Sequence, residues 1–146
     1  MKNIFILCLA FSLSAVHVFG QKNVPENVTK EFTKKYPVAK SVKWENEEAN
    51  EWKAKFNNNG KEISASFDNK GVWLETESEI SFKDLPESVV KTLKDKFDGF
   101  KTEKISAFEN TKMKGFEMIL NNKEEILLEV VFNSSGKVIK MEEVKK

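Results

Sequence analysis

The sequence predicts an α+β fold in which a helix followed by four antiparallel strands occurs twice, with all eight strands in one antiparallel sheet and both helices on one face. Three observations lead to this prediction: an internal repeat, a helical spacing of apolar residues at the start of each copy, and an apolar–polar alternation in the rest of each copy. We expect residues 1–20 to be an export signal and residues 21–146 to form a single domain of two repeats, about 24–80 and 85–144.

The internal repeat is the most informative feature of the chain. Residues 24–28 (VPENV) are followed 61 residues later by residues 85–89 (LPESV). Near the end of each copy, residues 67–71 (FDNKG) correspond to residues 132–136 (FNSSG). The order of helix start, aromatic positions and turn glycine is thus the same in both halves, which indicates a duplicated structural unit.

Each copy begins with a predicted helix. Val28, Phe32 and Tyr36 lie four residues apart, the spacing of the apolar side of an amphipathic helix, and Pro25 is favourable in its first turn. Pro37 then ends the first helix, because proline cannot continue it. The second helix repeats this pattern with Val89, Leu93, Phe97 and a following Gly99.

The remainder of each copy alternates with a period of two, as a sheet with one buried face requires. In the first copy the alternation covers residues 42–45, 52–56 and 63–67, with a fourth strand at about 72–80. Asn and Gly at the ends of these segments tolerate the positive φ angles of tight hairpins. The second copy repeats the pattern at residues 101–108, 112–121, 125–132 and 137–143.

The two units are expected to share one sheet. One helix over four strands makes a thin core, and the connecting residues 81–84 are too short for a flexible linker. Short hairpins make sequential strands antiparallel neighbours. The alternative, two independent units, is less consistent with this short connection.

The first twenty residues have the order of a secretory signal: Lys2 near the start, a largely apolar run from Ile4 to Val16, and Gly20 before the expected cleavage. The apolar run is short for a bilayer span, so we expect no stable membrane span after cleavage. The product is expected to be periplasmic or secreted. An uncleaved N-terminal anchor is the alternative.

Composition excludes several classes of chemistry. All 24 basic residues are Lys, and the only Cys and His, Cys8 and His17, lie within the expected signal. The rest of the chain therefore has no thiol nucleophile, imidazole base, disulfide, or Cys/His metal ligand. Without Lys2, 23 Lys balance 23 acids, and a neutral chain without Arg argues against nucleic acid as a partner. We predict no catalytic, cofactor-binding or metal-binding residues.

The motifs resemble a known family. The repeated Pro-Glu-x-x-Val helix start, the Asn-Gly-Lys-Glu turn at residues 59–62 and the hairpin at residues 68–75 are similar to those of the PepSY-like, or beta-lactamase-inhibitor-protein-like, family of exported bacterial proteins. The resemblance covers roughly residues 24–144. It implies a tandem-repeat α+β fold, a periplasmic or extracellular location, and a protein-binding or inhibitory role without catalytic residues.

Two apolar surfaces are candidates for binding. The aromatic stripe that includes Trp44 and Trp52 is interpreted as core, because the helices must cover that face. The opposite, helix-free face is polar in the first unit, whereas the second unit places apolar residues in the matching register. The predicted partner-binding residues on this face are Trp73, Ile119, Leu127 and Val131.

The predicted function is therefore an exported, non-enzymatic module that binds an unidentified protein or peptide of the cell envelope through the helix-free face, with a homodimer as one possible arrangement. A second hypothesis is a small-molecule or envelope-ligand binder with a pocket between helices and sheet, near Trp44 and Trp52. A third is a carboxylate-based hydrolase, which requires two acids converging in a cleft.

Overall fold

The structure, a computed structural model, describes residues 24–48, 50–124 and 126–144. The expected export signal lies outside these residues. Within these described ranges, two α-helices and one short 3₁₀-helix accompany eight strands. In chain order the elements are α1 (Glu26–Lys35), β1 (Lys40–Glu48), β2 (Glu51–Asn58), β3 (Lys61–Asp68), β4 (Trp73–Glu79), η1 (Phe82–Asp84), α2 (Glu87–Lys96), β5 (Lys101–Asn110), β6 (Lys114–Asn121), β7 (Leu127–Asn133) and β8 (Val138–Val144).

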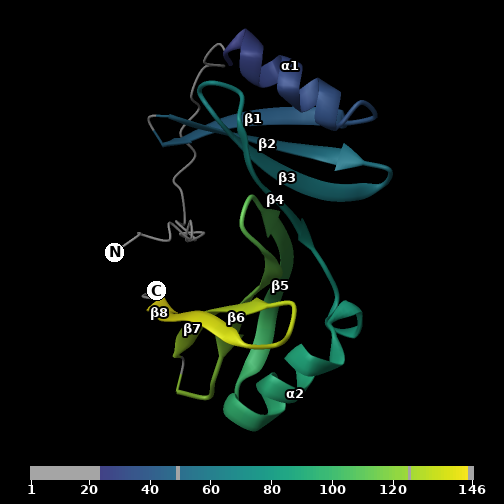
Figure 1. Cartoon of the computed structure of the whole chain (residues 1–146). Coiled ribbons are helices and arrows are strands. Elements are labelled where there is room, and N and C mark those ends of the chain that lie inside the picture. Colours follow the sequence, from purple (N-terminus) through teal and green to yellow (C-terminus); the bar gives the residue numbers. More distant parts are fainter. Residues whose placement is uncertain (1–23, 49, 125, 145–146) are drawn as a thin grey trace.

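All eight strands form one antiparallel sheet in sequence order, β1 to β8. The chain leaves the sheet after β4, passes through η1 and α2, and returns as β5 beside β4 (Figure 1). The predicted fold class, a helix plus four strands occurring twice in one eight-stranded antiparallel sheet, is confirmed.

The strand register places both helices on the same face of the sheet. Ala65 of β3 pairs with Thr76 of β4, which pairs with Glu109 of β5. Side chains of directly paired residues point to the same side, and alternate residues along a strand share that side. Ala65 packs beneath α1, and Ile105, four residues before Glu109, packs beneath α2.

The helix-covered face holds two separate cores, one in each unit. Under α1, Val28 and Phe32 are buried against an aromatic group in which the Phe32 and Phe56 rings lie 4.9 Å apart, edge to face. Under α2, Val89 and Leu93 are buried against Met118 and the aliphatic residues of β6 and β7. The first core is mainly aromatic and the second mainly aliphatic, although the same repeat positions supply both.

Each helix begins against the last hairpin of its own unit. Asp68 accepts hydrogen bonds from the backbone N–H groups of Lys70 and Val72, both at 2.8 Å, and Gly71 follows at φ +82°. Asn133 organises the corresponding turn of the second unit, with Gly136 at φ +81°. The repeat therefore extends to the hydrogen bonds of its turns.

The sheet is strongly bent (Figure 1). The helices lie on its outer side at opposite ends, while β4 and β5 cross the middle. The helix-free face consequently lines the inner side of the bend. Among the described residues, no helix has the length and apolar character needed to cross a membrane.

Candidate functional site

The helix-free face carries an unusual concentration of buried polar groups. Every polar or charged residue that is buried in the described part of the chain points to this face by its register, whereas an open sheet face is normally solvated. The bend explains the burial, because side chains on the inner side of a curve are brought together. These residues are Glu51, Lys53, Ser66, Glu77, Ser106 and Glu129.

Lys53 of β2 lies between two carboxylates. Its Nζ is 3.3 Å from Glu77 Oε2 and 3.3 Å from Glu47 Oε1. The Ser64 hydroxyl donates a hydrogen bond to Glu77 at 3.3 Å. Burial alone would lower the pKa of Lys53, but the two carboxylates raise it above its usual value, so the ammonium group remains charged.

Glu75 and Glu117 have pKa values well above those of ordinary carboxyls. Burial is the main cause for both: it raises the pKa of Glu75 to about 7 and that of Glu117 to about 8. The carboxylates of Glu129 and Glu77 raise the pKa of Glu117 further, and Lys104 acts in the opposite direction. Four carboxyl groups from β4, β6 and β7 thus influence one another on this face.

In the second unit, charged pairs and apolar side chains share the face. Lys140 Nζ is 3.3 Å from Glu129 Oε1 and 2.9 Å from Glu142 Oε2. The buried Phe108 ring lies over Gly115, where an added Cβ would come within 2.8 Å of it. The Phe132 carbonyl oxygen would lie even closer to that Cβ, at 2.2 Å, so backbone and ring together explain why β6 carries Gly at that position.

Three of the four predicted partner-binding residues are brought together on the helix-free face. Ile119 pairs with Glu129 on β7, and Leu127 and Val131 flank Glu129 on the same side of that strand. Ile119 and Leu127 are half-buried, whereas Val131 is fully buried at 0% exposure. Their role in partner binding stays a prediction, and only Ile119 and Leu127 offer contact area.

The predicted position of Trp73 on the helix-free face is wrong. Trp73 pairs with the core residue Phe67 and packs against the first core, and Lys35 of α1 lies 4.1 Å from the centre of its ring. A register shift between Ser66 and Phe67 causes this, because an extra residue in β4 reverses which side the side chains face.

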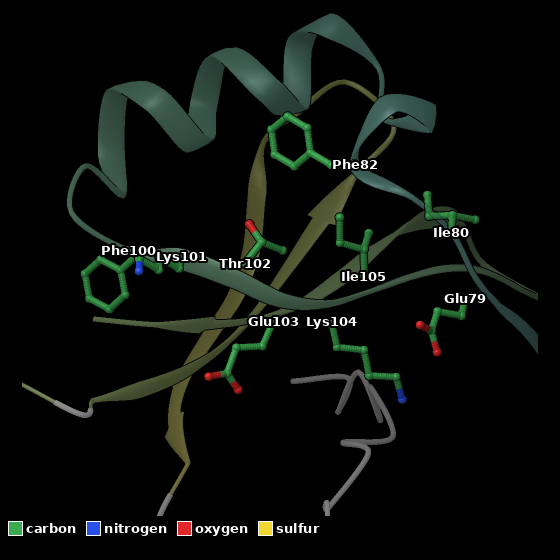
Figure 2. A pocket seen from close by; sticks show the side chains of 9 residues that line it. All are labelled: Glu79, Ile80, Phe82, Phe100, Lys101, Thr102, Glu103, Lys104 and Ile105. Carbon is green, nitrogen blue, oxygen red and sulfur yellow. The ribbon is translucent and has the colours of Figure 1, made fainter. Parts of the chain in front are cut away.

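A pocket of about 550 Å³ opens beside β5 (Figure 2). It is lined by residues 79, 80 and 82 on one side and residues 100–105 on the other. This pocket is not the one expected near Trp44 and Trp52. Both tryptophans belong to the first core, with Trp52 buried and Trp44 half-buried.

Sequence reasoning missed the buried carboxyl groups. Glu75, Glu77 and Glu79 alternate with their neighbours in β4, which indicates that the three side chains share one face of the sheet. The alternation does not indicate that this face is buried. No group of three or more acidic side chains is arranged to hold a metal ion in the described part of the chain.

The tandem fold, in which a helix and four strands occur twice in one bent sheet, defines a structural class. Comparison with known protein families shows which family this is. The chain belongs to the family described as "Putative beta-lactamase-inhibitor-like, PepSY-like", whose model matches it twice, over residues 14–64 and 50–140. The predicted resemblance is therefore confirmed. Among curated proteins, none matches the chain.

Several solved structures with the same fold are proteins of Bacteroides species. A DUF2874 family protein from Bacteroides ovatus is 21% identical, with a TM-score of 0.78 over 84% of this chain and 89% of that chain. A BLIP-like protein from Bacteroides fragilis is 21% identical, with a TM-score of 0.77 over 87% and 91%. A protein from Bacteroides eggerthii, described among "putative periplasmic proteins", is 15% identical. Its TM-score is 0.77, and the match covers 84% of this chain and 90% of that chain. At these identities the likeness establishes the fold.

Proposed function

We propose that the chain is an exported, non-enzymatic module that binds a protein or peptide of the cell envelope through the helix-free face of its sheet. The inhibitor-like description of its family supports a binding role, and the BLIP-like description of the Bacteroides fragilis protein agrees with it. The periplasmic description of the Bacteroides eggerthii protein supports the location. The signal at residues 1–20 and the single two-repeat domain at 21–146 are part of the same proposal.

One observation carries the proposal: the face that neither helix covers combines apolar side chains with charged groups held in fixed positions. Lys53 and Lys140 are each fixed between two carboxylates. These charged side chains are therefore already ordered before a partner binds. Ile119 and Leu127 supply apolar area beside the Lys140–Glu129 pair, since Ile119 pairs with Glu129 and Leu127 lies two residues before it. Preorganised polar groups around an apolar centre are the usual composition of a protein-binding surface.

The raised pKa of Glu117 suits this role. At neutral pH a carboxyl group with a pKa of about 8 is mostly protonated and uncharged. Covering it with a partner therefore costs less desolvation free energy than covering a carboxylate. The protonated group also donates a hydrogen bond, which a carboxylate cannot do.

The test removes apolar contact without disturbing the core. The variant Leu127→Asp changes a half-buried side chain, whereas Val131 is avoided because an aspartate at a fully buried site would unfold the sheet. The variant and the wild type, residues 21–146, serve as baits for an envelope extract. We expect the variant to lose, by at least about tenfold, the partner that the wild type retains.

Val72→Asp is the matched control, because Val72 is 53% exposed and lies in the loop before β4. It should retain the partner, and far-UV circular dichroism should be the same for all three proteins. Equal retention by Leu127→Asp and the wild type would contradict the proposal. A second copy of this chain is one of the partners that the experiment can reveal.

A further inference from the structure

The two repeat units are joined in the sheet through the pairing of β4 with β5. This pairing covers residues 75–79 of β4, and each unit keeps its own core under its own helix. On the helix side of the junction, Ser78 pairs with Ala107, and these two small residues belong to neither core. The Ser78–Ala107 pair thus separates the two cores, so the sheet can change its bend here without disrupting either of them.

The inner side of the same junction carries carboxyl groups from both units. Glu75 and Glu77 come from β4 of the first unit, and Glu117 and Glu129 come from β6 and β7 of the second. Phe108 of β5 lies between the two sets, because it pairs with Glu77 and its buried ring covers part of β6. The sheet bends toward this side (Figure 1), so the carboxyl groups of the two units are brought toward each other.

Lysines offset only part of this charge. Lys53 and Lys140 are each already held between two carboxylates other than Glu75 and Glu117. Glu117 makes no hydrogen bond or ion pair within the described part of the chain, and Lys104 is the lysine that acts on it. Glu75 accepts a hydrogen bond from the Asn110 side chain at 3.1 Å, but it has no ion pair among the described residues.

Both Glu75 and Glu117 face charged groups on several strands. The groups that face Glu75 are Glu51 and Lys53 of β2 and Glu77 of β4. The groups that face Glu117 are Glu77 and Glu79 of β4, Lys104 of β5, Glu129 of β7 and Lys140 of β8. Once Glu75 and Glu117 are both ionised, carboxylates outnumber lysines among these groups, and like charges from the two units oppose each other across the junction.

We propose that the junction between β4 and β5 is a pH-sensitive hinge, at which ionisation of Glu75 and Glu117 opens the bend of the sheet. While both carboxyl groups are protonated, the bent form carries little uncompensated charge on its inner side. When they ionise, repulsion between the units and the hydration of the new charges both favour a more open sheet. The hinge does not rest on the proposed binding role of the helix-free face.

The pKa values of the two groups support a change near neutral pH. Burial raises the pKa of Glu75 to about 7 and that of Glu117 to about 8 in the bent form. Opening the bend would expose both groups to water and lower their pKa values toward that of an ordinary glutamate. The bent form therefore binds protons more tightly, so it is favoured at low pH, and the open form gains as the pH rises through about 7 to 8.

The test measures the distance between the two edges of the sheet in the chain from residue 21 onward, which has no native cysteine. Spin labels are attached to Lys43→Cys on β1 and Val144→Cys on β8, which lie on the helix-free side by register. We expect double electron–electron resonance to give a distance about 5 Å longer at pH 9 than at pH 6. In the variant Glu75→Gln/Glu117→Gln neither group can ionise, so the short distance should persist at pH 9.

Two controls separate the hinge from other effects of pH. Glu45→Gln/Glu62→Gln is the matched variant, because both residues are exposed, and it should lengthen at pH 9 as the wild type does. A second pair of labels, at Lys30→Cys on α1 and Lys43→Cys on β1, lies within the first unit. Its distance should be the same at both pH values, whereas unfolding would change it.

Three results would overturn the inference. The first is an equal distance between the labels on β1 and β8 at pH 6 and pH 9. The second is a lengthening that persists in Glu75→Gln/Glu117→Gln, and the third is an equally large change within the first unit. None of these results depends on a partner, so the proposed function is still decided by its own test.

Discussion

At the scale of single residues, the fold strongly raises the pKa of the Glu117 carboxyl group. Burial and the neighbouring carboxylates raise its pKa to about 8, well above the value of a carboxyl in an unfolded chain. The folded state therefore binds a proton that the unfolded state releases. Stability contributed in this way is greatest below the unfolded pKa and is lost as the pH rises through the folded pKa.

The dependence of stability on the protonation of Glu117 gives a prediction at the residue scale. Each unit by which the fold raises the pKa costs at most about 1.4 kcal/mol of stability above the folded pKa. Because the Glu117 side chain is only half-buried, solvent screening reduces this cost. Glu117→Gln, which removes the charge but keeps the shape, should raise the free energy of unfolding at pH 8.5 by about 1–3 kcal/mol and change little at pH 5. The wild type should itself be more stable at pH 5 than at pH 8.5. Urea titrations at both pH values measure this.

Glu62→Gln is the control, since Glu62 is exposed on β3 and should give the same stability as the wild type at both pH values. A Glu117→Gln variant no more stable than the wild type at pH 8.5 would show that Glu117 is not destabilised by burial.

At the scale of elements, the sequence predicted most of what the structure shows. Proline starts, four-residue apolar spacing and Asn/Gly turns depend only on local geometry, so the two helices and eight strands fell within a few residues of their predicted bounds. The side that Trp73 faces could not be predicted, because one extra residue in β4 has no signature in the sequence and reverses every side chain beyond it.

The contact between helix start and hairpin gives the prediction at this scale. A Cβ added at Gly136 would lie 2.4 Å from the Ser88 carbonyl oxygen at the start of α2, and φ is +81°. Gly60 has a similar φ of +84° but no atom within 4 Å of the added Cβ. Gly60→Ala should therefore cost only the left-handed backbone, about 1–2 kcal/mol. Gly136→Ala should cost about 3 kcal/mol or more, since α2 must also shift.

Thermal unfolding of the two variants separates these contributions. Equal destabilisation by Gly60→Ala and Gly136→Ala would mean that the hairpin of the second unit does not hold the start of α2.

At the scale of the whole molecule, the bend of the sheet determines the surface chemistry. Alternation along the strands predicted which residues share the helix-free face, and Ile119, Leu127 and Val131 do share it. It did not predict that this face lies on the inner side of a curve, where Val131 and Glu129 are buried. Curvature is a property of all eight strands together, so no local pattern in the sequence carries it.

The helix-free face is shared by both units, because all eight strands form one sheet. The binding surface that we propose there therefore depends on the joining of the two repeats.

The most direct measurement of the central claim is site-specific photo-crosslinking in cells that produce the protein. Benzoylphenylalanine is introduced singly at Ile119 and Leu127 on the helix-free face, and at Val72 and Ser134 in the turns that end each unit on the helix side. We expect one common crosslinked partner at Ile119 and Leu127 and none at the two turn positions. Crosslinks at the turn positions alone would contradict it.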